Sequence, residues 1–335
     1  DGAGNPLPDF FALAAFAVVL RLFWPLIGEL KNAVHLFRQA DWAWVAGAAA
    51  AQISSYSFLA ALNYLLLRPF RGHATFRQLL AILPAMAFIE VALPSAGASG
   101  LVLRARLLGR LGYSAEVSSF TLLLETLYLI AMMVGVSVCG LWYLLQSGEM
   151  KLAELAYLVG VAALVVGATV AAFVAGRDRE RALRWTLALS VRWNALRGRF
   201  PRLPSRSAEA VTTRLNRFYD GLGELGETRR WPLLTAAFGR VALDVATLGA
   251  CFAAFHHPVS FGVLLTGYGL TLLLSAMAAL PGGMGLADAS LAVIYARLGA
   301  PGAVAIAAAL TYRLIAFWLL RLVGFLCWQI QEAKR

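Results

Sequence analysis

Long apolar stretches separated by short polar segments dominate the chain. Six of them approach or exceed the roughly 20 apolar residues that an α-helix needs to cross a bilayer, and they lie at 10–27, 42–67, 115–145, 152–176, 231–255 and 303–330. Because these runs do not alternate as the strands of a membrane barrel do, helices are the expected spanning elements. The pattern predicts an all-α, polytopic membrane protein with about six spanning helices.

Two further apolar segments, 78–111 and 259–298, are each interrupted by a Leu-Pro turn. Around these turns a block of sequence occurs twice, as LPSAGASGLVLRARLLGRLG at 93–112 and as LPGGMGLADASLAVIYARLG at 280–299. Both copies open with Leu-Pro and small residues, and both close with Arg-Leu-Gly at the same offset. Apolar segments broken at corresponding places in two halves are typical of transport sites built from internal repeats.

The distribution of charge predicts how these segments are threaded. Segment 177–230 holds thirteen arginines and six acidic residues, so we expect it to be cytoplasmic, as is the C-terminal Lys334-Arg335. Counting spans from there, hairpin 78–111 enters and leaves on the cytoplasmic side and hairpin 259–298 on the outer side, although Arg297 then lies outside. The prediction is therefore two re-entrant helical hairpins in an inverted repeat.

We interpret residues 1–335 as a single membrane domain in three parts. A first half, 1–176, and a second half, 231–335, flank the basic segment 177–230. Within that segment, residues 178–200 resemble an amphipathic helix whose arginines meet anionic lipid headgroups. Its role is either simple anchoring or the recruitment of a substrate. Nucleic-acid binding is the other interpretation of a basic stretch, and the membrane-spanning flanks argue against it.

The composition agrees with a membrane protein and limits the kinds of functional site that we expect. The chain is 60% hydrophobic and 14% charged, with a mean hydropathy of +0.72 and a formal net charge of +11. Its three cysteines lie inside apolar runs and predict neither disulfides nor a metal site. The sequence contains no metal-ligand cluster, P-loop or nucleotide fingerprint, so we expect no cofactor and no enzymatic activity.

Ionisable residues inside the apolar segments are the candidates for function, because each costs about 2.5–3.5 kcal/mol at a helix centre. Arg240 and Asp244 are four residues apart and either pair with each other or line a polar path. Glu125 and Arg313 follow the two closing glycines by thirteen and fourteen residues, which suggests an ion pair or a shared headgroup site between them. Arg321 lies further along the last helix.

The two turns are the second set of candidates. Glu90 precedes the first turn and Asp288 follows the second, so both carboxylates would suit a cationic headgroup or a proton. The helix starts near Gly97 and Gly285 carry partial positive charge and suit a phosphate. The alternative is that the glycines only permit tight turns.

Together these considerations define one predicted substrate-binding set. Its members are Glu90, Pro94, Ser95, Gly97, Ser99, Arg104, Glu125, Arg240, Asp244, Pro281, Gly282, Gly283, Gly285, Asp288, Tyr312 and Arg313.

One short motif suggests a different function. Gly97-Ala98-Ser99-Gly100 resembles the Gly-x-Ser-Gly element of rhomboid intramembrane proteases, whose serine needs a histidine base. The downstream histidines, His256 and His257, precede Pro258 outside any predicted helix. A rhomboid-like protease therefore stays a minor alternative.

The second block also resembles a known family. Pro281-Gly282-Gly283-Met284-Gly285-Leu286-Ala287-Asp288, the following Arg297-Leu298-Gly299 and the later Tyr312-Arg313 are similar to a signature of the lysylphosphatidylglycerol synthase transmembrane family. The first block is similar from Leu93-Pro94 through Arg104 to Gly112, but Ser99-Gly100 stands where the commoner form has an acidic residue and then Arg.

This resemblance implies a flippase-like protein that moves a polar-headgroup lipid across the bacterial inner membrane, passively or coupled to an ion. Phospholipids, polyprenyl-phosphate lipids and hopanoids are the lipid classes that the resemblance implies. The chain shows no soluble synthase domain, so we do not expect it to make lysylphosphatidylglycerol. The competing hypothesis is a membrane scaffold for a lipid-modifying enzyme or glycosyltransferase, and a homo-oligomer is compatible with either.

Overall fold

The computed structural model describes residues 35–70, 72–92, 98–147, 230–277 and 286–333, with the isolated positions 180, 184 and 212. Every regular element in these ranges is a helix, which confirms the all-α prediction. Within the described residues, four helical stretches are long and apolar enough to span a membrane: Trp42–Leu67, Ala115–Gly140, Trp231–Ala254 and Gly302–Gln329. They coincide with four predicted spans, whereas the predicted spans 10–27 and 152–176 lie outside the described residues.

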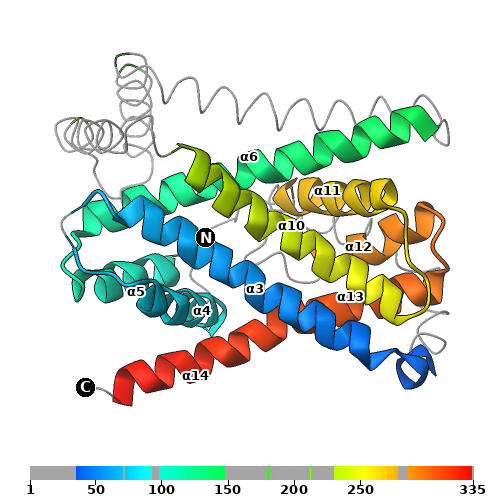
Figure 1. The fold of residues 1–335 in the computed structure, drawn as a ribbon, viewed down its shortest axis with the longest axis horizontal. Coiled ribbons are helices and arrows are strands. Elements are labelled where there is room, and N and C mark those ends of the chain that lie inside the picture. Colours follow the sequence, from blue (N-terminus) through cyan, green and yellow to red (C-terminus); the bar gives the residue numbers. More distant parts are fainter. Residues whose placement is uncertain are drawn as a thin grey trace, which may run out of the picture.

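The helices form two series of the same design (Figure 1). After the short turn η1 (Phe37–Gln39), the first series is α3 (Trp42–Leu67), α4 (Phe76–Ala92), α5 (Ala98–Gly109) and α6 (Ala115–Ser147). The second series is α10 (Arg230–Ala254), α11 (Phe261–Met277), α12 (Leu286–Arg297) and a long helix made of α13 (Gly302–Arg313), η4 (Leu314–Leu319) and α14 (Leu320–Ala333). In each series a long helix is followed by a hairpin of two short helices and then by a second long helix.

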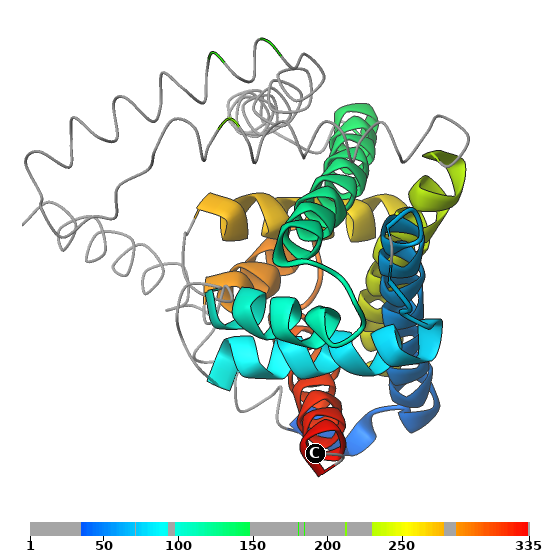
Figure 2. The ribbon, with the colours of Figure 1, turned by 90° about the vertical axis from the view of Figure 1, so that its left-hand side faces the viewer.

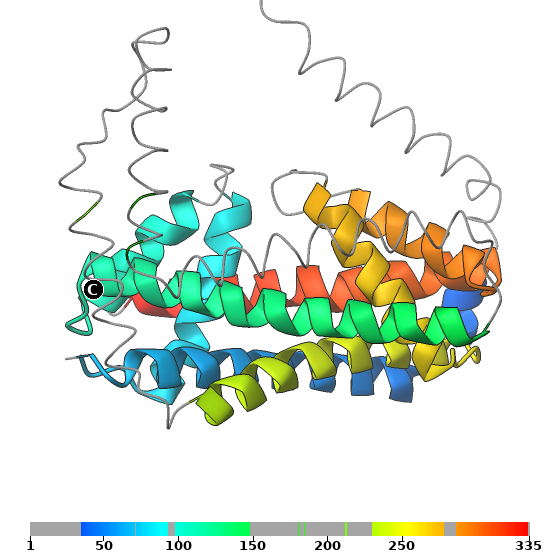
Figure 3. The same cartoon turned by 90° about the horizontal axis from the view of Figure 1, so that it is seen from above.

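The short helices cannot cross a bilayer alone. Helices α4 and α11 have 17 residues each and α5 and α12 have 12 each, which at 1.5 Å per residue gives about 25 Å and 18 Å against a hydrocarbon core of about 30 Å. Figure 1 shows the α4–α5 hairpin at one end of the long helices and the α11–α12 hairpin at the other. Figure 3 shows both hairpins inclined to the long helices and on the same side of the molecule.

The second short helix of each hairpin, α5 or α12, ends in the same kind of backbone turn. Gly112 and Gly299 have φ angles of 86° and 97°, a left-handed conformation in which a side chain is strained. In the first hairpin the Tyr113 N–H donates to the Leu108 carbonyl at 3.1 Å, and in the second the Ala300 N–H donates to the Tyr295 carbonyl at 2.9 Å. The repeated Arg-Leu-Gly of the sequence therefore marks two equivalent helix C-caps.

The two series interlock. Helix α3 packs along α10 in the opposite direction, and the Asp41 N–H at the start of α3 donates to the Ala254 carbonyl at the end of α10 at 2.8 Å. Helix α6 of the first series packs against α11 of the second, while α14 packs against α4. Figure 2, seen along the long axis, shows α3 beside α10 and the hairpins between the long helices. The hydrophobic core is consequently shared by both series.

Candidate functional site

A polar pocket of about 210 Å³ lies where helices α3, α10 and α13–α14 meet. The residues come from the middle of each long helix, several turns from either end. Although the surrounding helices are apolar, the pocket lining includes the side chains of three arginines and one aspartate. The lining residues are Gln52, Tyr56, Arg240, Asp244, Tyr312, Arg313, Ala316, Phe317 and Arg321.

The Asp244 carboxylate is the centre of a hydrogen-bond network in this pocket. Tyr268 from α11 donates its hydroxyl to Asp244 Oδ2 at 2.6 Å, and Tyr312 from α13 donates to the same oxygen at 3.0 Å. The guanidinium of Arg240 lies 3.3 Å from Asp244 Oδ1, one helical turn away. Of the two alternatives that the sequence left open for Arg240 and Asp244, the structure shows both: the residues pair with each other and they line the pocket. A buried carboxylate is tolerated when it is paired and hydrogen-bonded in this way.

Arg240 links α10 to α3. Its Nη1 donates to Ser55 Oγ at 3.0 Å, and its guanidinium lies 5.2 Å from the centre of the Tyr56 ring. The ion pair with Asp244 and these two contacts hold the guanidinium between two helices, so Arg240 forms part of a fixed wall of the pocket.

Another part of the pocket lining is built around Phe317 on the last long helix. The guanidiniums of Arg313 and Arg321 each lie 3.8 Å from the centre of the Phe317 ring. Two cations at that distance would collide on one ring face, so they lie on opposite faces. The three residues are four apart in sequence, and η4, a stretch of π-helix at Leu314–Leu319, lies between the two arginines. Such π-segments are frequent at functional sites.

Gln52 supplies an acceptor to the pocket. Its side chain is 1% exposed, and its Oε1 has no hydrogen-bond partner among the residues that the structure describes. A buried carbonyl oxygen without a partner costs about 1–3 kcal/mol. The pocket therefore contains a polar atom placed to receive a donor from a ligand or from water.

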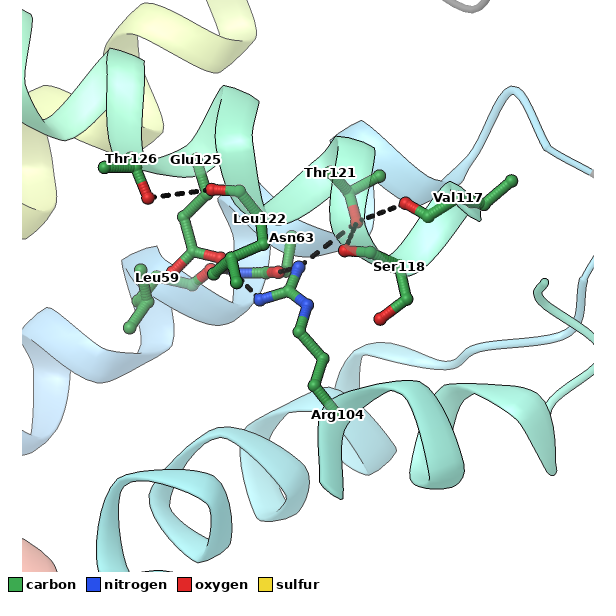
Figure 4. A network of polar contacts seen from close by, with 9 residues as sticks. All are labelled: Leu59, Asn63, Arg104, Val117, Ser118, Thr121, Leu122, Glu125 and Thr126. Carbon is green, nitrogen blue, oxygen red and sulfur yellow. Dashed lines mark hydrogen bonds and ion pairs between the residues drawn. The ribbon is translucent and has the colours of Figure 1, made fainter. Parts of the chain in front are cut away.

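A second polar cluster, shown in Figure 4, lies between α5, α6 and α3 and shares no residue with the pocket lining. The Arg104 side chain, 1% exposed, crosses from α5 to α6 and α3. It donates to Glu125 Oε2 at 2.7 Å, to Asn63 Oδ1 at 2.8 Å and to Thr121 Oγ1 at 3.2 Å. These contacts hold α5 of the first hairpin against the long helices α3 and α6.

The cluster corrects one sequence-based hypothesis. Glu125 was expected to pair with Arg313 or to share a headgroup site with it, because the two have nearly equivalent places in the repeat. Glu125 instead pairs with Arg104, and Arg313 lies in the pocket. Equivalent positions in the two repeats therefore do not mean that the two residues are in contact.

The other predicted site residues divide into two groups. Arg240, Asp244, Tyr312 and Arg313 meet in the pocket. The remaining predicted residues have side chains outside the part of the chain that the structure describes; these are Glu90, Pro94, Ser95, Gly97, Ser99, Pro281, Gly282, Gly283, Gly285 and Asp288. The rhomboid-like alternative depends on Ser99 and stays a prediction.

Sequence reasoning missed Gln52, Tyr56, Tyr268 and Phe317 as members of the site. For three of them, Gln52, Tyr56 and Phe317, the four-residue spacing along one helix was a signal that could have been used. Gln52 and Tyr56 are four apart on a helix made mostly of apolar residues, and Phe317 lies four residues from both Arg313 and Arg321. Residues four apart share one helix face, so the pattern marks a polar face on each helix.

Comparison with known proteins gives a consistent result. Residues 11–324 match the family described as the lysylphosphatidylglycerol synthase TM region. A protein of Methanothermobacter thermautotrophicus named a UPF0104 membrane protein is 31% identical over 131 residues, which is 37% of this chain and 39% of that protein. The aligned part thus spans well under half of that relative. The family match, in contrast, covers nearly the whole chain, and the protein belongs to the lysylphosphatidylglycerol synthase transmembrane-region family.

Proposed function

We propose that this protein is a lipid translocase that moves a polar-headgroup lipid across the cytoplasmic membrane, passively or coupled to an ion, without chemical change to the lipid. The observation that carries the proposal is the polar pocket at mid-length of the long helices. Ionisable groups at the centre of a membrane are expensive, and they typically mark the path of a substrate or ion. Membership of a family described by a lipid-synthase membrane region supports a lipid as the cargo.

The surface beside the pocket suits lipid tails. A row of large apolar side chains follows one face of the last long helix at intervals of four residues, and each is strongly exposed: Leu310, Leu314, Trp318, Leu322 and Leu326. Arg313, Phe317 and Arg321 each immediately precede a member of this row. Adjacent residues of a helix point about 100° apart, so the tails would remain on the row while the headgroup enters the pocket.

The charges at the two ends support an orientation. The end where α3 and α5 finish and α4 begins carries Arg68, Arg77, Arg106 and Arg110, and the His73 N–H there donates to the Leu111 carbonyl at 3.0 Å. The opposite end carries Asp41 and the two histidines 256 and 257, with two arginines, Arg38 and Arg297. By the positive-inside rule we place the arginine-rich end in the cytoplasm, together with segment 177–230.

The test is movement of fluorescent phospholipids in liposomes containing the purified protein. An impermeant reductant bleaches labels in the outer leaflet, so bleaching beyond that of protein-free liposomes reports translocation. We expect such movement for the parent protein and its loss in Arg313→Gln. Arg106→Gln removes an exposed arginine outside the pocket and should translocate like the parent.

The alternative is a membrane scaffold for a lipid-modifying partner. A scaffold would move no labelled lipid above the protein-free rate, and Arg313→Gln would behave as the parent does. That result for phospholipid, polyprenyl-phosphate and hopanoid probes alike would overturn the translocase proposal.

A further inference from the structure

The last long helix changes its hydrogen-bond pattern midway along its length. The N–H of Leu314 is shared between the carbonyls of Leu310 and Thr311, and the N–H of Leu320 donates to the carbonyl of Phe317, three residues earlier. Between these points η4 is wound as a π-helix, in which the bonds span five residues. Because bonds of different spacing compete here, the helix can exchange one set for another without losing them, and π-segments are accordingly places where helices bend.

The two halves of this helix have different partners. Helix α13 packs against α10 and α12 of its own series, whereas α14 packs against α4 of the other series. On α14, Gly324 lies so close to the Pro84 carbonyl that a side chain there would collide with it, and the Phe325 ring lies 5.3 Å from the ring of Phe88. A bend at η4 would therefore move α14 together with the part of α4 that it contacts.

Helix α4 has an irregular point of its own beside this contact. Pro84 lies inside the helix, where a proline has no N–H to donate and its ring disturbs the preceding turn, so the helix can bend there. Before the proline, Leu79 and Leu83 belong to a buried cluster with Leu67 of α3. After it, Phe88 packs on α14. The proline thus separates a half of α4 that is held by α3 from a half that is held by α14.

The equivalent pair of helices in the repeat has neither irregularity. Helices α11 and α6 pack against each other as α4 and α14 do, again with close backbone contact at a glycine, Gly140. Helix α6 is a continuous α-helix from Ala115 to Ser147, and neither α6 nor α11 contains a proline. Two helix pairs with the same place in the repeat therefore differ in how easily they bend, and we expect the α6–α11 pair to be the stiffer.

We propose that α14 and the adjoining half of α4 are the moving part of this protein, with η4 and Pro84 as the hinges, and that the α6–α11 pair stays fixed against α3 and α10. Bending at η4 would change the shape of the pocket, because Ala316 and Phe317 belong to η4 and line it. Movement of one helix unit about a few hinge residues is a common way to open and close a site. The movement would belong to the protein whether or not it translocates a lipid.

A stack of three side chains spans the hinge at η4. Arg313 of α13 and Arg321 of α14 each lie 3.8 Å from the centre of the Phe317 ring, and Phe317 belongs to η4 itself. Contacts between a guanidinium and an aromatic ring are attractive, so the stack favours the bend angle that the structure shows. The same three residues line the pocket, and a change in what the pocket contains would thereby act on the hinge.

The experiment measures distances between two spin labels on the protein in lipid nanodiscs. The α14 labels are placed at Leu326→Cys on α14 and Phe238→Cys on α10, and the α6 labels at the native Cys139 on α6 and Ile53→Cys on α3; all four positions are exposed. The remaining native cysteines are replaced by alanine in each case. Leu326 and Cys139 are matched, because each lies 27 residues after the closing glycine of its repeat.

We expect two populations of distance for the α14 labels and a single narrow one for the α6 labels. Leu326 lies nine residues beyond Phe317, or about 14 Å along the helix, so a bend of about 20° moves it by about 5 Å. Equally narrow distributions for both sets of labels would overturn the proposal, and so would two populations for the α6 labels alone.

Two variants assign the movement to the hinges. Pro84→Ala restores a backbone donor to α4 and should narrow the distribution of the α14 labels. Phe317→Leu removes the stack on the two arginines and should broaden it. The α6 labels in the same two backgrounds should give an unchanged distance, which excludes misfolding as the cause. An unchanged distribution of the α14 labels in both variants would overturn the assignment of η4 and Pro84 as hinges.

The distance measurement is independent of the translocation assay, so the two proposals can fail separately. Two populations of the α14 labels in a protein that translocates no lipid would support the hinges and contradict only the translocase. Translocation by a protein whose α14 and α6 labels give equally narrow distributions would overturn the hinges and leave the translocase standing.

Discussion

Arg104 illustrates how a buried charge can be structural in a protein that also has three arginines lining a pocket. Its guanidinium contacts three side chains on α3 and α6 and is almost wholly buried. The sequence placed it in the substrate-binding set because it belongs to a repeated block. The structure surrounds it with protein acceptors, so we assign it to holding the α4–α5 hairpin in place.

Replacing Arg104 by Ala should therefore destabilise the protein. It leaves the Glu125 carboxylate buried without its cation, a change that costs about 3–5 kcal/mol. Thermal unfolding in detergent, with Arg106→Ala as an exposed control, measures the effect. If Arg104→Ala unfolds like the parent yet no longer moves lipid, Arg104 belongs to the substrate path after all.

The two tyrosines on Asp244 should contribute separately to stability. Tyr268→Phe and Tyr312→Phe each remove one hydrogen bond to a charged oxygen, so we expect each to lower the free energy of unfolding by about 1.5–3 kcal/mol. Tyr143→Phe is the matched control, because its hydroxyl bonds Ser260 at an exposed position. Comparable losses in all three variants would show that Asp244 does not depend on these donors.

At the scale of elements, small residues decide how the two series interlock. A Cβ added at Gly140 of α6 would lie 2.6 Å from the Cα and N atoms of Thr266 on α11. On α14, a Cβ at Gly324 would collide with the Pro84 carbonyl of α4. Close backbone contact at small residues is the usual way in which membrane helices pack.

Gly140→Ala should consequently weaken the contact between α6 and α11. Its methyl group meets backbone, which cannot turn aside as a side chain can, and overpacking of this kind costs about 1–3 kcal/mol. Gly135→Ala on the same helix meets nothing within 4 Å and should be neutral or slightly stabilising. Unfolding in detergent compares the two variants, and equal stability would mean that α6 and α11 are not in close contact.

At the scale of the whole molecule, each hairpin should begin and end on one side of the membrane. Cysteines can replace the exposed residues Arg77 and Arg110 at the ends of the first hairpin, and Ser260 and Arg297 at the ends of the second. The native Cys139, Cys251 and Cys327 are first replaced by alanine. In inside-out and right-side-out vesicles, an impermeant maleimide should label the first pair from the cytoplasmic side and the second from the outer side.

The two members of each pair are controls for one another. A hairpin that crossed the membrane would place its two cysteines on opposite sides. Labelling of Arg77→Cys and Arg110→Cys from different sides would therefore contradict the re-entrant arrangement, whichever side the protein presents to the cytoplasm.

Much of the fold was predictable from the order of residues. Four long spans were located from apolar length alone, since the hydrocarbon core sets the length of a spanning helix. The ends of the hairpins were recognisable because Arg-Leu-Gly recurs and glycine is the residue that adopts a positive φ at low cost. The pairing of Arg240 with Asp244 was also predictable, because it is set by one turn of one helix.

The composition of the site was not predictable in this way. Gln52, Tyr268 and Phe317 join Arg240 and Arg313 from four different helices, and no periodicity within one helix reports which neighbour it meets. The same reasoning error placed Glu125 beside Arg313. Contacts between helices depend on crossing angle and on where small residues allow close approach, both of which are properties of the packed structure.

By itself, therefore, the sequence determined the membrane-spanning class, the helical hairpins and their capped ends, because these depend on local hydrophobicity and backbone preference. Only the tertiary structure decided that Arg104 bonds α5 to α3 and α6, and that Arg313 and Arg321 line a pocket with Asp244. The physical reason is that a charge inside a membrane must find partners or water, and only the packing of helices distant in sequence decides which of these it finds.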